Sequence, residues 1–93
     1  MISYRELAEN IYKRETFIAN YFYEETPNYP HKFHILLLSD DIQMEEAFET
    51  VAHDLHEFHV PVEHINISAW TNVDIFLEYI LKKQRNELFI DRK

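Results

Sequence analysis

The chain has 93 residues, of which 46% are hydrophobic, which suffices for one compact domain with a single core. It contains no cysteine and no glycine, which excludes disulfides, zinc–thiolate sites, phosphate loops and glycine-rich dinucleotide fingerprints. Its formal net charge at pH 7 is −8. The longest apolar run, Ile35–Leu38, is too short to cross a bilayer. We therefore expect a cytoplasmic protein that neither enters nor binds a membrane.

The N-terminal segment has the pattern of a long amphipathic helix. Ser3 and Glu6 form a capping box, and apolar residues then recur at helical spacing as far as Phe22. The pattern predicts a first helix over about residues 4–23. The two prolines of segment 26–30 predict a loop after it.

Two later segments have the patterns of strands. Residues 33–38 form an apolar run that ends at Ser39, which predicts a short buried strand. Residues 62–70 alternate between apolar and polar side chains, which predicts a half-buried strand. The apolar face of this second strand carries Ile65, Ile67 and Ala69.

Two further helices are predicted. Residues 42–58 place apolar side chains such as Val51 on one side and carboxylates on the other. Thr71, with Asp74 three residues further on, predicts the start of a third helix. After that helix we expect an extended or frayed tail over residues 87–93.

These elements predict the fold class α/β, more narrowly α+β, with the order α-β-α-β-α in one domain over residues 1–93. Because a helix connects the two strands, they should lie parallel in a small two-stranded sheet that helices cover on one face. Such a sheet leaves unpaired edges and an uncovered face, which proteins usually pair or cover. We therefore expect a homodimer, with an interface on the uncovered face formed by His64, Asn66, Ser68 and Trp70.

The charges are distributed unevenly along the chain. From Phe33 to Leu81 there are ten Asp or Glu residues and no Lys or Arg. A surface of this kind repels nucleic acid and anionic lipid and attracts a basic partner. The predicted partner-binding residues are Asp40, Asp41, Glu45, Glu46, Glu49, Asp54, Glu57, Glu63, Asp74 and Glu78.

Two groups of side chains could bind a metal ion. Asp40 and Asp41 follow the first predicted strand, where α/β enzymes often hold magnesium, but Asp is also a preferred helix-capping residue. His53 shares a helix face with Glu49 and Glu57, yet no third ligand is evident for either pairing. We therefore expect no metal ion and no cofactor.

Catalysis has little support in the sequence. Ser3, Ser39 and Ser68 each have a capping or strand-surface explanation, and none lies in a nucleophile elbow. The acidic array is therefore the main functional signal. We expect a protein that acts by binding and not an enzyme.

The spacing of the acids can be compared with that of DNA phosphates. The segment 40–57 carries seven acids over roughly 25 Å of helical rise, where duplex DNA carries about fifteen charges. In length, acidity, lack of cysteine and mixed α/β order, the chain resembles the small acidic DNA-mimic anti-restriction proteins of T-even phages, the Arn type. Its basic segment 82–85 departs from a uniformly acidic surface.

The resemblance implies an inhibitor that presents its carboxylates as phosphate surrogates and blocks a DNA-binding protein, such as a restriction nuclease with a basic groove. It also implies action in a host cytoplasm, without direct binding to nucleic acid. The alternative is an acidic antitoxin-like or adaptor protein that neutralises a basic partner without imitating DNA.

Overall fold

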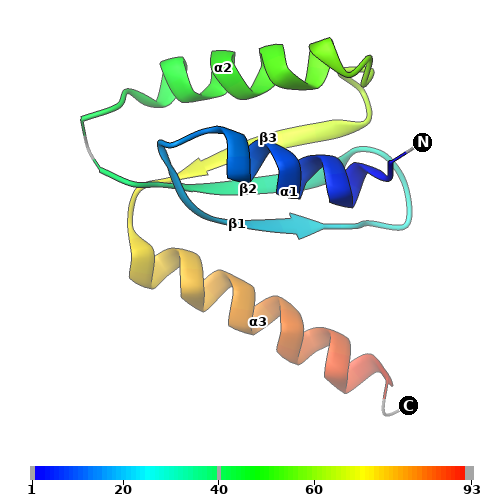
Figure 1. Ribbon diagram of the computed structural model, residues 1–93. Coiled ribbons are helices and arrows are strands. Elements are labelled where there is room, and N and C mark those ends of the chain that lie inside the picture. The colour runs from blue at the N-terminus through cyan, green and yellow to red at the C-terminus, as the bar shows by residue number, and fades with distance from the viewer. Residues whose placement is uncertain (1, 40, 92–93) are drawn as a thin grey trace.

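The computed structural model describes residues 2–39 and 41–91, with side chains described as far as Arg85. Over these described residues, three helices and one three-stranded sheet form an α+β fold (Figure 1). None of the described helices is both long and apolar enough to cross a membrane. In chain order the elements are α1 (Tyr4–Arg14), β1 (Ile18–Glu24), β2 (His31–Leu37), α2 (Met44–Glu57), β3 (Ile65–Trp70) and α3 (Val73–Asp91).

The sheet has the order β1-β2-β3. β2 and β3 are parallel, as predicted for two strands joined by a helix, with Phe33 opposite Ile67. β1 pairs antiparallel with the other edge of β2, which makes the predicted two-stranded sheet wrong. The alternation predicted for β3 is confirmed, because Ile65, Ile67 and Ala69 all belong to or contact the core.

The predicted first helix is wrong over its second half. α1 ends at Arg14, and residues 18–24 form β1 instead. Aromatic and β-branched side chains favour strands, and the spacing of Ile18 and Phe22, four residues apart, fits a strand as well as a helix. The strand pairing is irregular between Ile18 and Asn20, which brings both Ile18 and Tyr23 to the core.

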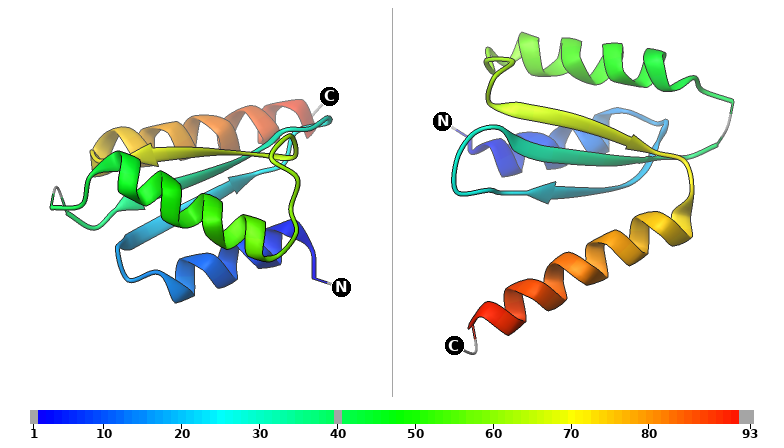
Figure 2. Two further views of the ribbon diagram at one scale, coloured as in Figure 1. Left: turned by 90° about the horizontal axis from the view of Figure 1, so that it is seen from above. Right: turned by 180° about the vertical axis from the view of Figure 1, so that it is seen from behind.

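The core fills one face of the sheet, where α1 and α2 lie, whereas α3 lies on the opposite face (Figure 2). Leu7 and Ile11 of α1, with Val51 of α2, pack against Phe33 and Ile35 of the central strand. The register of a strand sends alternate side chains to opposite faces, so His34 between these two residues faces α3.

The prediction that helices cover a single face of the sheet is therefore wrong. α3 covers the second face through Phe76, which is fully buried and contacts Trp70 in a T-shaped arrangement with ring centroids 5.9 Å apart. Asn72 starts this helix by accepting a hydrogen bond from the Ile75 N–H. The helix continues to Asp91, so residues 87–91 of the predicted tail are helical.

Candidate protein-binding surface

The outer surface of α2, with the loop before it, forms an acidic face. Five exposed carboxylates define it: Asp41, Glu45, Glu46, Glu49 and Glu57. α2 directs them outward because Ala47, Val51 and Leu55 recur at helical spacing and are buried against the sheet. Met44 and Phe48, which helical spacing places on the apolar side of α2, are 43% and 36% exposed at its border.

The acidic face carries little compensating charge. Among the described residues, Glu45, Glu46 and Glu49 form no ion pair, and Arg14 is the one basic side chain paired with α2. Arg14, the last residue of α1, lies beside the C-terminal end of α2, where its Nη1 is 3.3 Å from Glu57 Oε2. The carboxylates without a described counter-charge therefore lie over the N-terminal half of α2, where the helix dipole stabilises them.

Asp54 does not belong to this surface, contrary to the prediction. Its side chain is buried, with the residue only 3% exposed, and its Oδ1 lies 3.7 Å from Arg14 Nη1. Its Oδ2 has no hydrogen-bond partner among the described groups unless the neighbouring Glu15 carries a proton. A hydrogen bond to Asp54, together with burial and the charge of Asp54, raises the pKa of Glu15 to about 7.

His53, Asp54 and Glu57 bring three potential metal ligands within 4.8 Å of one another. Arg14 already contacts both carboxylates of this cluster. Its guanidinium offsets the buried negative charge without an ion, and the raised pKa of Glu15 favours the protonated form of that side chain beside Asp54. The cluster therefore has a structural explanation, as a joint between α1 and α2.

The remaining predicted acids do not join the acidic face. Glu63 is exposed in the turn before β3, whereas Asp74 and Glu78 are exposed on α3, across the sheet from α2. Asp40 lies outside the described residues. The acidic array of the sequence is thus divided between two sides of the molecule, a separation that helical spacing alone could not reveal.

An apolar groove, which the sequence analysis missed, runs beside the acidic face between α2 and the edge strand β3. Its volume is about 190 Å³. Val62 at its rim is 84% exposed, which is unusual for a valine. The sequence signal for this groove was the pair of valines, Val60 and Val62, on either side of Pro61. The groove is lined by Ala52, Leu55, His56, Val60, Pro61, Val62, Ile65 and Ile67.

Trp70 is not free to form the predicted dimer interface, because α3 covers it. Its Nε1–H donates a hydrogen bond of 3.1 Å to Nδ1 of His34, which leaves His34 Nε2 to donate to Glu24 Oε1, also at 3.1 Å. The Tyr79 hydroxyl donates to the same Glu24 oxygen at 2.6 Å, and Lys83 Nζ lies 3.3 Å from the other. We call these five residues the α3 network.

The α3 network shifts the pKa values of His34 and Glu24. Burial lowers the pKa of His34, and the indole donor at Nδ1 also requires the neutral ring. Burial raises the pKa of Glu24, but hydrogen bonds from Tyr79, His34 and Lys83 outweigh it, so the pKa is lowered overall. The network is therefore an ionised carboxylate held by a neutral histidine, a phenol and an ammonium.

The other predicted interface residues have separate surroundings. His64 lies before β3, where its ring stacks on Tyr29 with centroids 3.8 Å apart and its Nδ1 is 2.9 Å from the Tyr4 hydroxyl. Asn66 is exposed and Ser68 is partly buried, on the side of β3 that faces α3. The four residues therefore do not form one open surface.

Comparison with known proteins identifies no relative: no protein-family profile, no curated protein and no solved structure matches this chain. The likeness to the Arn-type proteins thus rests on length, charge, composition and mixed α/β order. What the protein does must be argued from its own surface.

Proposed function

We propose that the protein is an acidic inhibitor that binds a basic protein surface through the acidic face of α2. The partner would be a DNA-binding protein or nuclease, blocked at the groove where it otherwise holds DNA. The observation that carries the proposal is the uncompensated charge of Glu45, Glu46 and Glu49, which no described basic side chain pairs.

The spacing of these charges suits attraction of a basic groove more than detailed imitation of a duplex. α2 spans roughly 20 Å, over which both strands of DNA carry about twelve phosphates. The acidic face offers fewer than half that number, close to what one strand presents. Binding should therefore depend on the field over the whole face and weaken steeply with salt.

Binding is favoured over catalysis by the position of the titratable groups. The described pairing that most resembles acid–base machinery is His34 with Glu24, and His34 is only 3% exposed beneath α3. Both ring nitrogens are already hydrogen-bonded within the α3 network. A substrate could not reach this histidine without displacing the helix.

The second candidate function is an antitoxin-like or adaptor protein that neutralises a basic partner without occupying its DNA site. The apolar groove beside the acidic face favours it, because protein interfaces combine an apolar centre with a charged rim. A phosphate backbone has no counterpart for Val62 and Ile67. A partner that uses the groove would be recognised by more than its charge.

The test is capture of host proteins on the immobilised protein, repeated with a short duplex DNA as competitor and at two salt concentrations. The inhibitor proposal predicts that the duplex and the triple reversal Glu45→Lys, Glu46→Lys and Glu49→Lys each release the partner. The matched control reverses Glu6, Glu9 and Glu25, which lie outside α2. The described ion pairs of Glu9 and Glu25 are exposed, and Glu6 is exposed without a described ion pair. This control should still bind.

The two candidates give different results in the same experiment. Release by Val62→Ser but not by duplex DNA would favour the adaptor over the inhibitor. A folded triple reversal that binds as tightly as the parent would contradict both, because each requires the acidic face.

A further inference from the structure

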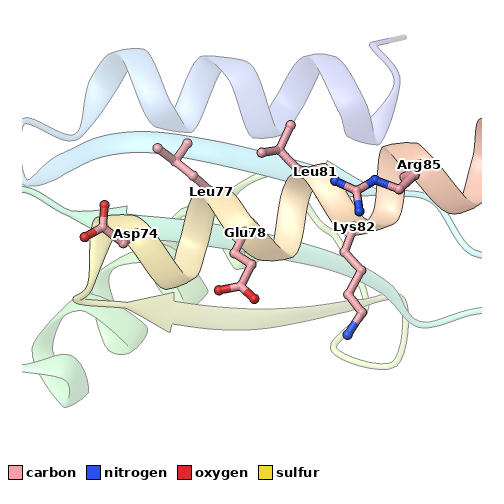
Figure 3. A pocket seen from close by; sticks show the side chains of 6 residues that line it. All are labelled: Asp74, Leu77, Glu78, Leu81, Lys82 and Arg85. Carbon is pink, nitrogen blue, oxygen red and sulfur yellow. The ribbon is translucent and has the colours of Figure 1, made fainter.

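The outer surface of α3 is the second feature of the molecule without a described partner. Leu77 and Leu81 lie one helical turn apart and are 44% and 55% exposed (Figure 3). They line a shallow depression of about 340 Å³. Large aliphatic side chains this exposed, and next to each other, are typical of surfaces that become covered.

Charged side chains flank the two leucines, with the acidic ones before the basic ones along the helix. Asp74 and Glu78 lie towards the start of α3, and Lys82 and Arg85 lie towards its C-terminal end (Figure 3). None of these four forms an ion pair among the described residues, whereas Lys83 turns inward to Glu24. We call this whole surface the α3 ridge. Its first half along the helix is therefore acidic, and its second half is basic.

We propose that two copies of the chain associate through their α3 ridges, with the helices antiparallel about a two-fold axis near residues 79 and 80. In this arrangement Asp74 of each copy faces Arg85 of the other, and Glu78 faces Lys82. The same rotation brings Leu77 and Leu81 of both copies together in the seam between the helices. A ridge with this sequence of charges is complementary to itself under a two-fold rotation.

A second copy fits the ridge better than other occupants do. A partner of uniform charge, such as DNA or an anionic membrane, would be attracted by one half of the ridge and repelled by the other. The antiparallel pair also opposes the dipoles of the two helices. Because α2 lies across the sheet, such a dimer leaves both acidic faces exposed, and the inference does not depend on the proposed function.

The size of the ridge limits the strength of the dimer. The described segment from Val73 to Arg85 is roughly 20 Å long and about 10 Å wide, which is less than the ~800 Å² per partner of a standard interface. We therefore expect a dissociation constant on the order of 10 to 100 µM. The association should weaken with salt, because ion pairs on an exposed rim are screened.

The test uses two charge variants of the full chain. Asp74→Lys with Glu78→Lys makes the ridge basic, and Lys82→Glu with Arg85→Glu makes it acidic. Sedimentation should show that each variant alone self-associates at least about tenfold more weakly than the parent, since like charges then face each other. An equimolar mixture of the two should form a heterodimer at least as strong as the parent homodimer.

Controls separate loss of the interface from loss of the helix. Circular dichroism and Trp70 fluorescence report whether α3 is still seated, because Trp70 contacts both Phe76 and Tyr79. Leu77→Ser with Leu81→Ser keeps every charge and should also weaken association. The proposal is overturned if the parent is monomeric at several hundred micromolar, if either charge variant self-associates like the parent, or if the mixture does not pair.

Discussion

The two faces of the sheet hold their helices by different kinds of contact. On the face covered by α1 and α2, the contacts come from apolar side chains such as Leu7, Val51 and Phe33, which interdigitate in a continuous core. On the other face, α3 is held by the buried ring of Phe76 and by the α3 network. The attachment of α1 and α2 depends on the area and volume of apolar burial, whereas the attachment of α3 depends largely on hydrogen-bond geometry.

This difference has consequences for stability and for pH. Apolar burial is non-directional and does not titrate, so the apolar contacts of the core should tolerate changes of pH, unlike the polar contact of Arg14 and Glu15 with Asp54. A buried polar network stabilises only while each donor has its acceptor, and loss of one partner leaves the others unsatisfied. We therefore expect α3 to open locally under conditions that leave the rest of the fold intact.

The largest expected effect comes from the core. Phe33 is fully buried, and Phe33→Ala should lower the free energy of unfolding by about 4 kcal/mol because the cavity cannot refill. Urea unfolding followed by circular dichroism measures it, and both faces should lose stability together. A loss below about 1 kcal/mol would show that the core is not the main support of the fold.

A smaller and more local effect is expected from the α3 network. Glu24→Ala removes the acceptor of His34 and Tyr79 and should cost about 2 to 3 kcal/mol. Hydrogen exchange should show lost protection in α3 while the amides of α2 change less. Glu24→Gln is the matched control, because it keeps an acceptor oxygen and loses the charge that faces Lys83. Equal loss of protection in α2 and α3 would contradict a separate attachment of α3.

Acid should weaken the attachment of α3. The pKa of His34 is lowered in the folded protein, so the unfolded chain takes up its proton first and stability is lost as pH falls below about 6.5. The lowered pKa of Glu24 adds a further loss below about pH 4.5. Trp70 is the one tryptophan of the chain, so its fluorescence should report loosening of α3 between pH 7 and 5. Unchanged emission and exchange over this range would contradict it.

The joint between α1 and α2 should respond to pH in the opposite direction. The pKa of Glu15 is raised from 4.5 to about 7. The stability that this side chain contributes to the fold is therefore fully present below pH 4.5 and is lost as pH rises through 7. Between pH 6 and 8 the parent should therefore lose on the order of 1 kcal/mol. Glu15→Gln keeps a donor for Asp54 and should remove most of this loss, as urea unfolding at both pH values would show. A variant with the same pH dependence as the parent would exclude Glu15 as its source.

The same contrast explains what could be predicted from the sequence. β2, β3 and α2 were predicted nearly to their ends because their hydrophobic periods reflect burial against one apolar core. The position of α3 could not be predicted, since its inward face includes Tyr79 and Lys83, whose partner Glu24 lies far away in the sequence. β1 was missed because apolar residues four apart satisfy both helical and strand periods.

The candidate site shows a similar division. Glu45, Glu46 and Glu49 were predicted to be exposed and are exposed, because they lie opposite the buried stripe of their own helix. Asp54 lies at the border of that stripe, and whether it faces solvent is decided by Arg14 at the end of α1 and by Glu15, which follows α1. Local periodicity cannot supply such information.

The smallest expected effect concerns the end of α2, where His59 has a positive φ of 60°. The Val60 N–H reaches back to the Leu55 carbonyl at 3.0 Å, a closure that commonly uses glycine in the left-handed position. A side chain with a Cβ is strained there, so His59→Gly should relieve strain. The extra freedom of the unfolded glycine chain offsets part of this gain, which leaves about 0.5 kcal/mol.

The comparison with His59→Ala separates strain from loss of the imidazole, because alanine keeps the Cβ. We expect the alanine variant to be no more stable than the parent and the glycine variant to be more stable than both in urea unfolding. Because His59 follows α2 on the core side of the sheet, the gain should raise global stability and leave the local opening of α3 unchanged. An equal gain from alanine would mean that the histidine ring, and not the backbone conformation, is the source of the cost.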